Sequence, residues 1–219
     1  MTTQVTAVDS GASKIGPIAG IVFVILFVLS FFLYHTPDSK ASDAKWLSWW
    51  QDSGHRHQAF IASLAMALAA VAFLWLAGAL RRRLGAALGA DASYGGGVAV
   101  GVICLIAAVG AGSVAVAHDL ADVPIPKDVD LLRYADGGYY GFIFLALPFA
   151  AAAFLIPLFS ALGRSGVLPA WLRVAALVVG IICLSGPFLF IVPIVLFLLW
   201  VLIASIALLM RDGATPANG

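Results

Sequence analysis

The sequence contains no glutamate, and its eleven acidic residues are all aspartates. This absence excludes motifs that depend on glutamate, such as the His-Glu-x-x-His zinc helix and the glutamate-terminated calcium loop. Charged residues make up only 11% of the chain, whereas a soluble domain usually has about 25%. The chain has no basic–aromatic pattern and no nucleic-acid motif, so DNA and RNA are not expected partners.

Cysteine is also scarce, with only Cys104 and Cys183. Both lie inside apolar runs, where a lone cysteine usually serves as a small packing residue. Two such residues do not imply a disulfide framework. We therefore expect no redox role for either thiol.

Apolar residues, by contrast, are abundant. Hydrophobic residues make up 63% of the chain, and the mean hydropathy is +1.05. Several runs of 17 or more residues carry no charge, which is typical of membrane-spanning helices. The sequence predicts an all-α fold, a polytopic helical bundle in a membrane.

The apolar runs predict six transmembrane helices between short cytoplasmic tails at residues 1–14 and 211–219. The run from 172 to 210 is too long for one span, and Ser185-Gly186-Pro187 marks its break. The first run exceeds the apolar region of a signal peptide, so we expect it to be retained. The six predicted spans are about 15–34, 59–80, 97–117, 139–162, 172–188 and 189–210.

The connections between these spans carry further predictions. Residues 35–57 should contain a short helix capped by Ser42 or Asp43, with tryptophans lying in the lipid headgroup layer. Residues 84–96 should form a Gly/Ala loop. Residues 118–138 should form a loop whose short helix, around 128–135, ends at Gly137-Gly138. Kinks are expected at Pro148 and Pro157 in the fourth span.

The arginine cluster that follows the second span predicts the orientation. If Arg81-Arg82-Arg83 is cytoplasmic, the inner side carries seven basic and three acidic residues, a net charge of +4. The outer side then carries five basic and eight acidic residues, a net charge of −3. Both termini are predicted to be cytoplasmic.

All four histidines fall at the outer ends of the first three predicted spans. Imidazole and carboxylate groups are common zinc ligands, and such a cluster would suit a metal-dependent hydrolase acting at the outer leaflet. No zinc-ligand spacing is present, however, and a solvated polar rim explains the same residues, so no metal or other cofactor is predicted. The candidate ligand-binding residues of this outer face are His35, His55, Arg56, His57, His118 and Asp119.

No charged residue lies deep inside a predicted span. Ion pumps and ion-coupled carriers usually need ionisable groups near the midplane, so this absence counts against those classes. A carrier for a neutral solute remains an alternative, because prolines interrupt the fourth to sixth spans.

Three stretches also suggest a family. His55-Arg56-x-x-Ala59 opens the second span, Phe73-Leu74-Trp75-Leu76 approaches its end, and the segment at 166–172 reads Gly-Val-Leu-Pro-Ala-Trp-Leu. Together they resemble a family of uncharacterised multi-pass membrane proteins of high-GC Gram-positive bacteria. The resemblance implies a six-helix bundle in the bacterial plasma membrane and assigns no catalytic residue.

The sequence therefore favours a non-enzymatic component of the plasma membrane. We expect it to bind membrane lipids, with a membrane protein partner or a second copy of the chain as the other option. The observation behind this expectation is the lack of any recognisable catalytic or ion-pathway pattern.

Overall fold

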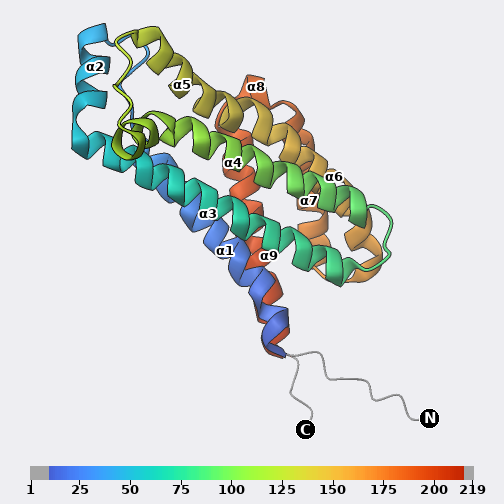
Figure 1. Cartoon of the computed structure of the whole chain (residues 1–219). Coiled ribbons are helices and arrows are strands. Elements are labelled where there is room, and N and C mark those ends of the chain that lie inside the picture. Colours follow the sequence, from blue (N-terminus) through green and yellow to red (C-terminus); the bar gives the residue numbers. More distant parts are fainter. Residues whose placement is uncertain (1–9, 215–219) are drawn as a thin grey trace.

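Two long helices form the hairpin around which the other helices pack (Figure 1). The computed structural model of the chain describes residues 10–214, which contain helices and no strand. The hairpin consists of α3 (Ser53–Leu84) and α4 (Ala90–Ala121), each of 32 residues. The turn between them requires positive φ at Gly85 and Gly89, a conformation that glycine adopts without steric cost.

The remaining long helices complete a closed ring. They are α1 (Ser10–Leu33), α6 (Leu147–Ser165), α7 (Ala170–Leu184) and α9 (Val192–Ala214). Contacts run from α9 to α1, α3, α4, α6, α7 and back to α9. The first and last described helices begin and end at the same end of the bundle, which is also the end of the α3–α4 turn (Figure 1).

Aromatic side chains fill the middle of this ring. The rings of Phe23, Phe73, Phe154 and Phe197 come from four different helices and are all buried. The centroid of Phe73 lies 4.7 Å from that of Phe23, 5.3 Å from Phe154 and 5.7 Å from Phe197. These contacts are within the range of favourable aromatic pairing, so the bundle has a packed centre.

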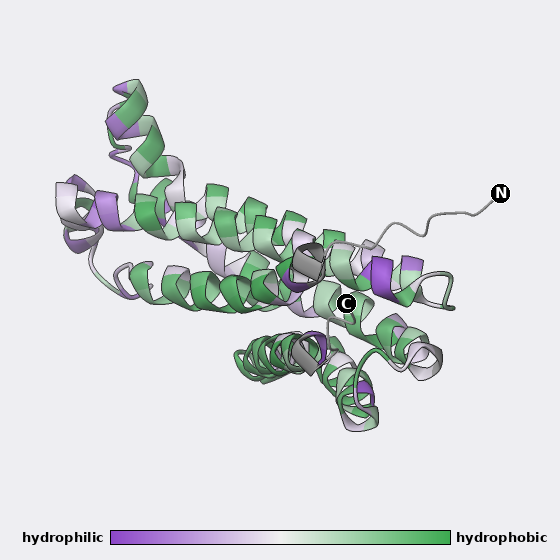
Figure 2. Cartoon of the chain, turned by 90° about the horizontal axis from the view of Figure 1, so that it is seen from below, coloured by the Kyte–Doolittle hydropathy of each residue, from purple (hydrophilic) through white to green (hydrophobic). Residues whose placement is uncertain are grey.

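Five helices are long and apolar enough to cross a membrane, and α7 is a shorter apolar helix of 15 residues. Hydrophobic residues dominate the lengths of the helices, while hydrophilic residues gather near their ends (Figure 2). This arrangement is that of a multi-pass helical membrane bundle. The predicted break at Ser185-Gly186-Pro187 is confirmed, because α7 ends at Leu184 and the short α8 (Gly186–Leu189) follows.

The helices extend beyond the apolar runs that define the predicted spans, and the predicted loop at 84–96 is wrong in extent. α3, which contains the second predicted span, begins at Ser53. The predicted Gly/Ala loop at 84–96 is reduced to the short turn between Leu84 and Ala90. α1 includes residues 10–14 of the predicted tail, and α9 reaches Ala214. The rest of the two predicted tails, 1–9 and 215–219, lies outside the described residues. Polar residues extend these helices beyond the segment that hydropathy detects.

The predicted end of a short helix at Gly137-Gly138 is also wrong. α5 (Val129–Gly141) passes through both glycines and continues through the π-helix η1 (Phe142–Ala146) into α6. Burial of Tyr139 just after the glycines favours continuation over their weak helix propensity. The wider π-turn directly precedes Pro148, where an ordinary α-helical carbonyl at Phe144 would collide with the proline ring.

Candidate functional site

The sequence-predicted residues Arg56 and Asp119 meet at the end of the bundle opposite the termini. The Arg56 Nε atom lies 2.8 Å from Asp119 Oδ1, joining α3 to α4. Arg56 Nη1 donates to the carbonyl oxygens of Trp50 and Gln51 at 2.9 Å and 2.8 Å. Arg56 is buried and its Nε and Nη1 donors are engaged by protein, so it holds the corner between α2 (Asp43–Gln51) and α3.

The four histidines do not share one site. The ring of His55 stacks on Trp49 with centroids 5.0 Å apart, and its Nδ1 lies 3.4 Å from Asp52. The Nδ1 atom of His118 lies 3.0 Å from the carbonyl oxygen of Val123, while His35 and His57 are exposed. Among residues 10–214, no group of three or more histidine, cysteine or aspartate side chains is placed to hold a metal ion.

The prediction that the α2 tryptophans lie in the headgroup layer is wrong. The predicted cap at Ser42 is present, but Trp46, Trp49 and Trp50 are buried within the protein. Trp46 Nε1 donates to the carbonyl oxygen of Asp38 at 3.3 Å. The indole rings therefore form the interior of an outer cap, which we define as residues 34–56 together with α5.

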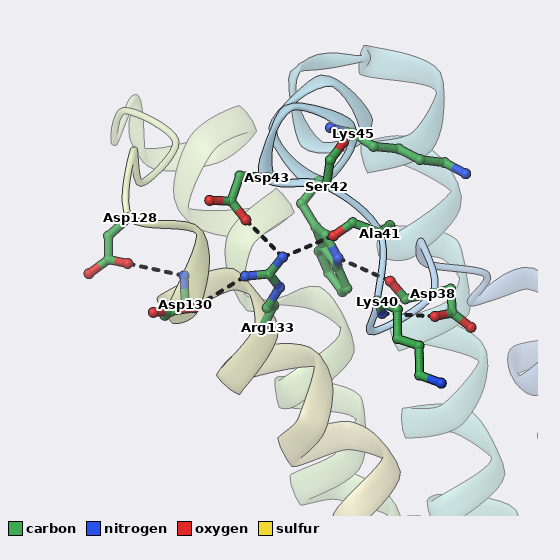
Figure 3. A network of polar contacts seen from close by, with 10 residues as sticks. Asp38, Lys40, Ala41, Ser42, Asp43, Lys45, Asp128, Asp130 and Arg133 are labelled. Carbon is green, nitrogen blue, oxygen red and sulfur yellow. Dashed lines mark hydrogen bonds and ion pairs between the residues drawn. The ribbon is translucent and has the colours of Figure 1, made fainter.

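Arg133 of α5 closes this outer cap (Figure 3). Its guanidinium contacts Asp43 at 2.8 Å, the carbonyl oxygen of Ala41 at 3.0 Å and Asp130 at 3.3 Å. The first two contacts bridge residues about ninety positions apart in the chain. A guanidinium is suited to this role because its planar fork donates several hydrogen bonds in fixed directions.

A second polar cluster, which the sequence did not predict, lies where α1 ends beside α5. Thr36 Oγ1 donates to Asp136 Oδ1 at 2.7 Å. The buried Tyr34 hydroxyl faces the same carboxylate without a hydrogen bond of good geometry. Burial, and then the nearby Asp136 charge, raise the pKa of Tyr34 well above its ordinary value. The phenol is therefore neutral and able to donate.

Asp136 has no cationic partner among the described residues. The rings of Tyr34 and Tyr139 lie beside it with centroids 4.4 Å apart, and Tyr140 packs against both. A partly buried carboxylate among aromatic rings attracts a cation or a hydrogen-bond donor. We call Tyr34, Thr36, Asp136 and Tyr140 the polar cluster.

An apolar groove runs along the bundle below the polar cluster. It encloses about 470 Å³ of empty space, part of it open at the mouth, and its wall is entirely apolar. α1, η1 and α9 all contribute to it. Its main lining side chains are Phe27, Phe31, Phe32, Phe144, Ile194 and Leu198.

The groove and the polar cluster share their walls. Phe144 of the groove stacks on Tyr140 with centroids 6.0 Å apart, and Phe31 meets Phe144 edge to face at 6.1 Å. Asp136 precedes Tyr140 by one helical turn, and Thr36 follows the lining residue Phe32 by four positions. An elongated molecule in the groove would therefore have its outer end near Asp136.

The sequence contained a signal for this cluster. Asp136, Tyr139 and Tyr140 are spaced i, i+3 and i+4, which places them on one face of a helix. The prediction of a helix end at Gly137-Gly138 separated Asp136 from the tyrosines and hid that pattern.

Comparison of the chain with protein-family models, curated proteins and solved structures finds no match. The resemblance to a family of uncharacterised multi-pass membrane proteins of high-GC Gram-positive bacteria therefore stays a prediction.

Proposed function

We propose that this protein is a six-span plasma-membrane protein that binds a lipid in the lateral groove between α1, η1 and α9. The single observation that carries the proposal is an entirely apolar groove that ends beside a carboxylate for which residues 10–214 supply no cationic partner. The lipid would place an acyl chain in the groove and its head group at the polar cluster. This is a binding function and not a catalytic one.

The topology part of the proposal counts α7 as the sixth crossing. Its position in the closed ring supports that count, and so does the location of both described chain ends at one end of the bundle (Figure 1). The same end carries Arg81–Arg83, so the distribution of basic residues favours placing it in the cytoplasm. The outer cap and the polar cluster would then face outward.

An acyl chain is the occupant that suits the groove. The walls belong to helices that are apolar enough to cross a membrane, and several lining side chains, including Val28 and Val195, are exposed to the surroundings. In a bilayer, those surroundings are lipid chains. Burial of apolar surface gives little driving force there, so packing and polar contacts must supply the selectivity.

The polar cluster indicates which head group is preferred. Asp136 offers carboxylate oxygens, and the tyrosine rings beside it offer electron-rich faces. A primary ammonium group satisfies both by donating hydrogen bonds to the carboxylate and lying against the rings. We therefore propose a lipid with an amine-bearing head group.

The other readings have less support. A carrier needs a path through the bundle, and four phenylalanines fill its centre. A hydrolase at the outer leaflet would need converging ligands, and the described histidines are spread over separate contacts. A protein partner or a second copy at the groove is an outcome that the binding test can reveal.

Lipid binding can be tested by native mass spectrometry on the detergent-purified chain. The probes are dioleoyl phosphatidylethanolamine and dioleoyl phosphatidylcholine, which share chains and phosphate but differ in amine donors. We expect a preference of about tenfold for the ethanolamine lipid, the size of one charge-assisted hydrogen bond. Asp136→Asn should remove most of that preference.

Val195→Trp should weaken binding of both lipids by filling the groove, because Val195 lines it. The matched control is Val109→Trp on α4, which is 69% exposed and away from the groove. Unchanged binding in Val195→Trp would overturn the groove as the site. An undiminished preference in Asp136→Asn would overturn the head-group assignment, and a dimer mass in place of bound lipid would favour a second copy.

The topology can be tested with introduced cysteines, since Cys104 and Cys183 are both buried. We expect a membrane-impermeant thiol reagent applied to intact cells to label Asp128→Cys and to leave Ala87→Cys unlabelled. The reverse pattern would invert the proposed orientation.

A further inference from the structure

The three consecutive arginines at the end of α3 have different surroundings. The Arg81 Nε atom lies 2.6 Å from Asp91 Oδ1, and the Arg83 Nη2 atom lies 2.6 Å from Asp212 Oδ2. Arg82 makes no ion pair with any carboxylate among the described residues, and its side chain is exposed. One of the three positive charges is therefore available to a ligand.

Arg82 lies at the edge of a hollow between α3 and α4. Leu74, Trp75, Gly78 and Tyr94 form the rest of its lining, and the hollow is shallow and open to the surroundings. A Cβ atom on Gly78 would lie 3.8 Å from Arg82 Nη1, so the guanidinium lies over the part of α3 that has no side chain.

The hollow changes from polar to apolar along α3. Arg82 is seven residues from Trp75, about 10 Å along a helix. Trp75 and Tyr94 are 55% and 42% exposed, and rings of this kind concentrate where a membrane meets water. Leu74 continues the apolar side toward the middle of the helix. In the proposed orientation, the charged group would lie at the level of the lipid head groups and the apolar wall at the level of the acyl chains.

We propose that this hollow binds an anionic phospholipid of the cytoplasmic leaflet. The guanidinium of Arg82 donates two parallel hydrogen bonds to the lipid phosphate, a geometry that arginine provides and lysine does not. The first part of an acyl chain lies along Trp75 and Leu74. Basic pockets between helices on the cytoplasmic side are suited to anionic head groups, because the opposite charges attract at a depth with reduced screening.

The apolar half of the hollow is the reason for choosing a lipid over a free phosphate. A small anion needs only the guanidinium, and the exposed Trp75 and Tyr94 rings would then stay uncovered. The site is also independent of the outer groove. Arg82 belongs to the last turn of α3, which lies at the chain-end side of the bundle (Figure 1), and the hollow shares no lining residue with the groove.

The test measures binding to the full chain in detergent micelles by native mass spectrometry. The probes are dioleoyl phosphatidylglycerol, dioleoyl phosphatidylcholine and soluble glycerol 3-phosphate as a competitor. We expect the wild-type chain to bind phosphatidylglycerol about tenfold more tightly than phosphatidylcholine, as one charge-assisted contact would give. Arg82→Gln should reduce that preference to less than twofold.

Lys14→Gln is the matched control, because it removes one exposed positive charge at the same end of the bundle and outside the hollow. Gly78→Leu is the second variant, which keeps the charge and fills the hollow, and it should weaken binding by a similar factor. Equal losses in Lys14→Gln and Arg82→Gln would overturn the site in favour of unspecific charge attraction. Full binding in Arg82→Gln would overturn it as well.

Effective competition by glycerol 3-phosphate would overturn the lipid assignment and leave a small-anion site. Thermal unfolding of each variant accompanies the binding data, and the exposed position of Arg82 predicts an unchanged midpoint for Arg82→Gln. Failure of the outer groove proposal would leave these expectations unaltered, because the two sites respond to different variants and different head groups.

Discussion

The two ends of the bundle are held together in different ways. At the chain-end side, helices touch through glycine, and a Cβ added to Gly16 or Gly96 would collide with a neighbouring helix. At the outer end, Gly137, Gly138 and Gly141 have open space around the same position. There the helices are joined by arginine hydrogen bonds and buried tryptophans. The groove lies among the more widely spaced helices of the outer end, whereas the hollow beside Arg82 lies on the surface of the closely packed chain-end side.

Breaking the Arg56 contact should have the largest effect on stability. Arg56→Gln leaves Asp119 without its ion-pair partner at a site where the arginine side chain is only 10% exposed. We expect the free energy of unfolding to fall by about 3 kcal/mol, measured by denaturant titration in detergent.

Asp119→Asn should also lower the free energy of unfolding. The double variant should lose less stability than the sum of the two single losses. Additive losses would mean that the two side chains do not stabilise each other. Hydrogen exchange should place the damage in α2 and the start of α3, and protection at the chain-end side should persist.

A change at Gly96 should weaken the opposite end. A methyl group on Gly96 would overlap the backbone of α6 at Ala153 and Phe154. Gly96→Ala should therefore cost about 1–3 kcal/mol of stability through overpacking.

The control for Gly96→Ala is the adjacent residue. Gly95→Ala meets nothing within 4 Å, and alanine favours the helix, so it should gain about 0.5–1 kcal/mol. Opposite signs at adjacent positions, measured by thermal unfolding, would support close glycine packing at the chain-end side. Equal effects would contradict the close approach of α4 and α6.

Arg133 should contribute less than Arg56, because its side chain is 30% exposed. Arg133→Gln should lower stability by about 1 kcal/mol and increase proteolysis within the outer cap. Arg133→Lys keeps the charge without the planar fork, so a loss close to that of the glutamine variant would identify hydrogen-bond geometry as the cause. Full stability of both variants would mean that the tryptophan packing alone holds the cap.

The smallest effect is expected at Asp52, the exposed N-cap of α3. The backbone N–H of His55 donates to its carboxylate at 2.9 Å and holds the pKa of Asp52 below its ordinary value. The stability that the ionised Asp52 carboxylate contributes is therefore fully present above its ordinary pKa, near 4. That stability is lost as the pH falls through the lower pKa of the folded state. Asp52→Asn keeps the cap and removes this titration. Thermal unfolding at pH 7 and pH 3.5 should show a smaller loss for the variant than for the wild type.

Much of the fold can be predicted from the sequence, because length and hydropathy are enough to identify helices of this kind. The break after Leu184 and the short capped helix after Ser42 were both predictable from local signals. The helix ends were not predictable, because polar residues such as His55 and Arg81 continue a helix that hydropathy alone truncates. The same reasoning missed that the α2 tryptophans face protein, since amphipathicity does not identify what an apolar face contacts.

The candidate site was likewise predictable only in part. Arg56 and Asp119 could be selected from the sequence, yet only the structure pairs them and shows that their role is to hold the cap. The Thr36–Asp136 contact joins residues 100 positions apart. It depends on packing of the segment after α1 against α5, which no local sequence pattern encodes. Charge counts likewise could not separate Arg82 from its paired neighbours.

The short length of α7 has a consequence for the surrounding membrane. Its 15 residues span about 22 Å, against a hydrocarbon thickness of about 30 Å. As the proposed sixth crossing, α7 would create a hydrophobic mismatch of that size, which local thinning of the bilayer would relieve. Just beyond α7, Phe190 stacks on Phe144 of the groove wall with centroids 4.2 Å apart. We expect the lipid occupancy of the groove to change with bilayer thickness, and binding measured in nanodiscs of shorter and longer lipids would reveal that coupling.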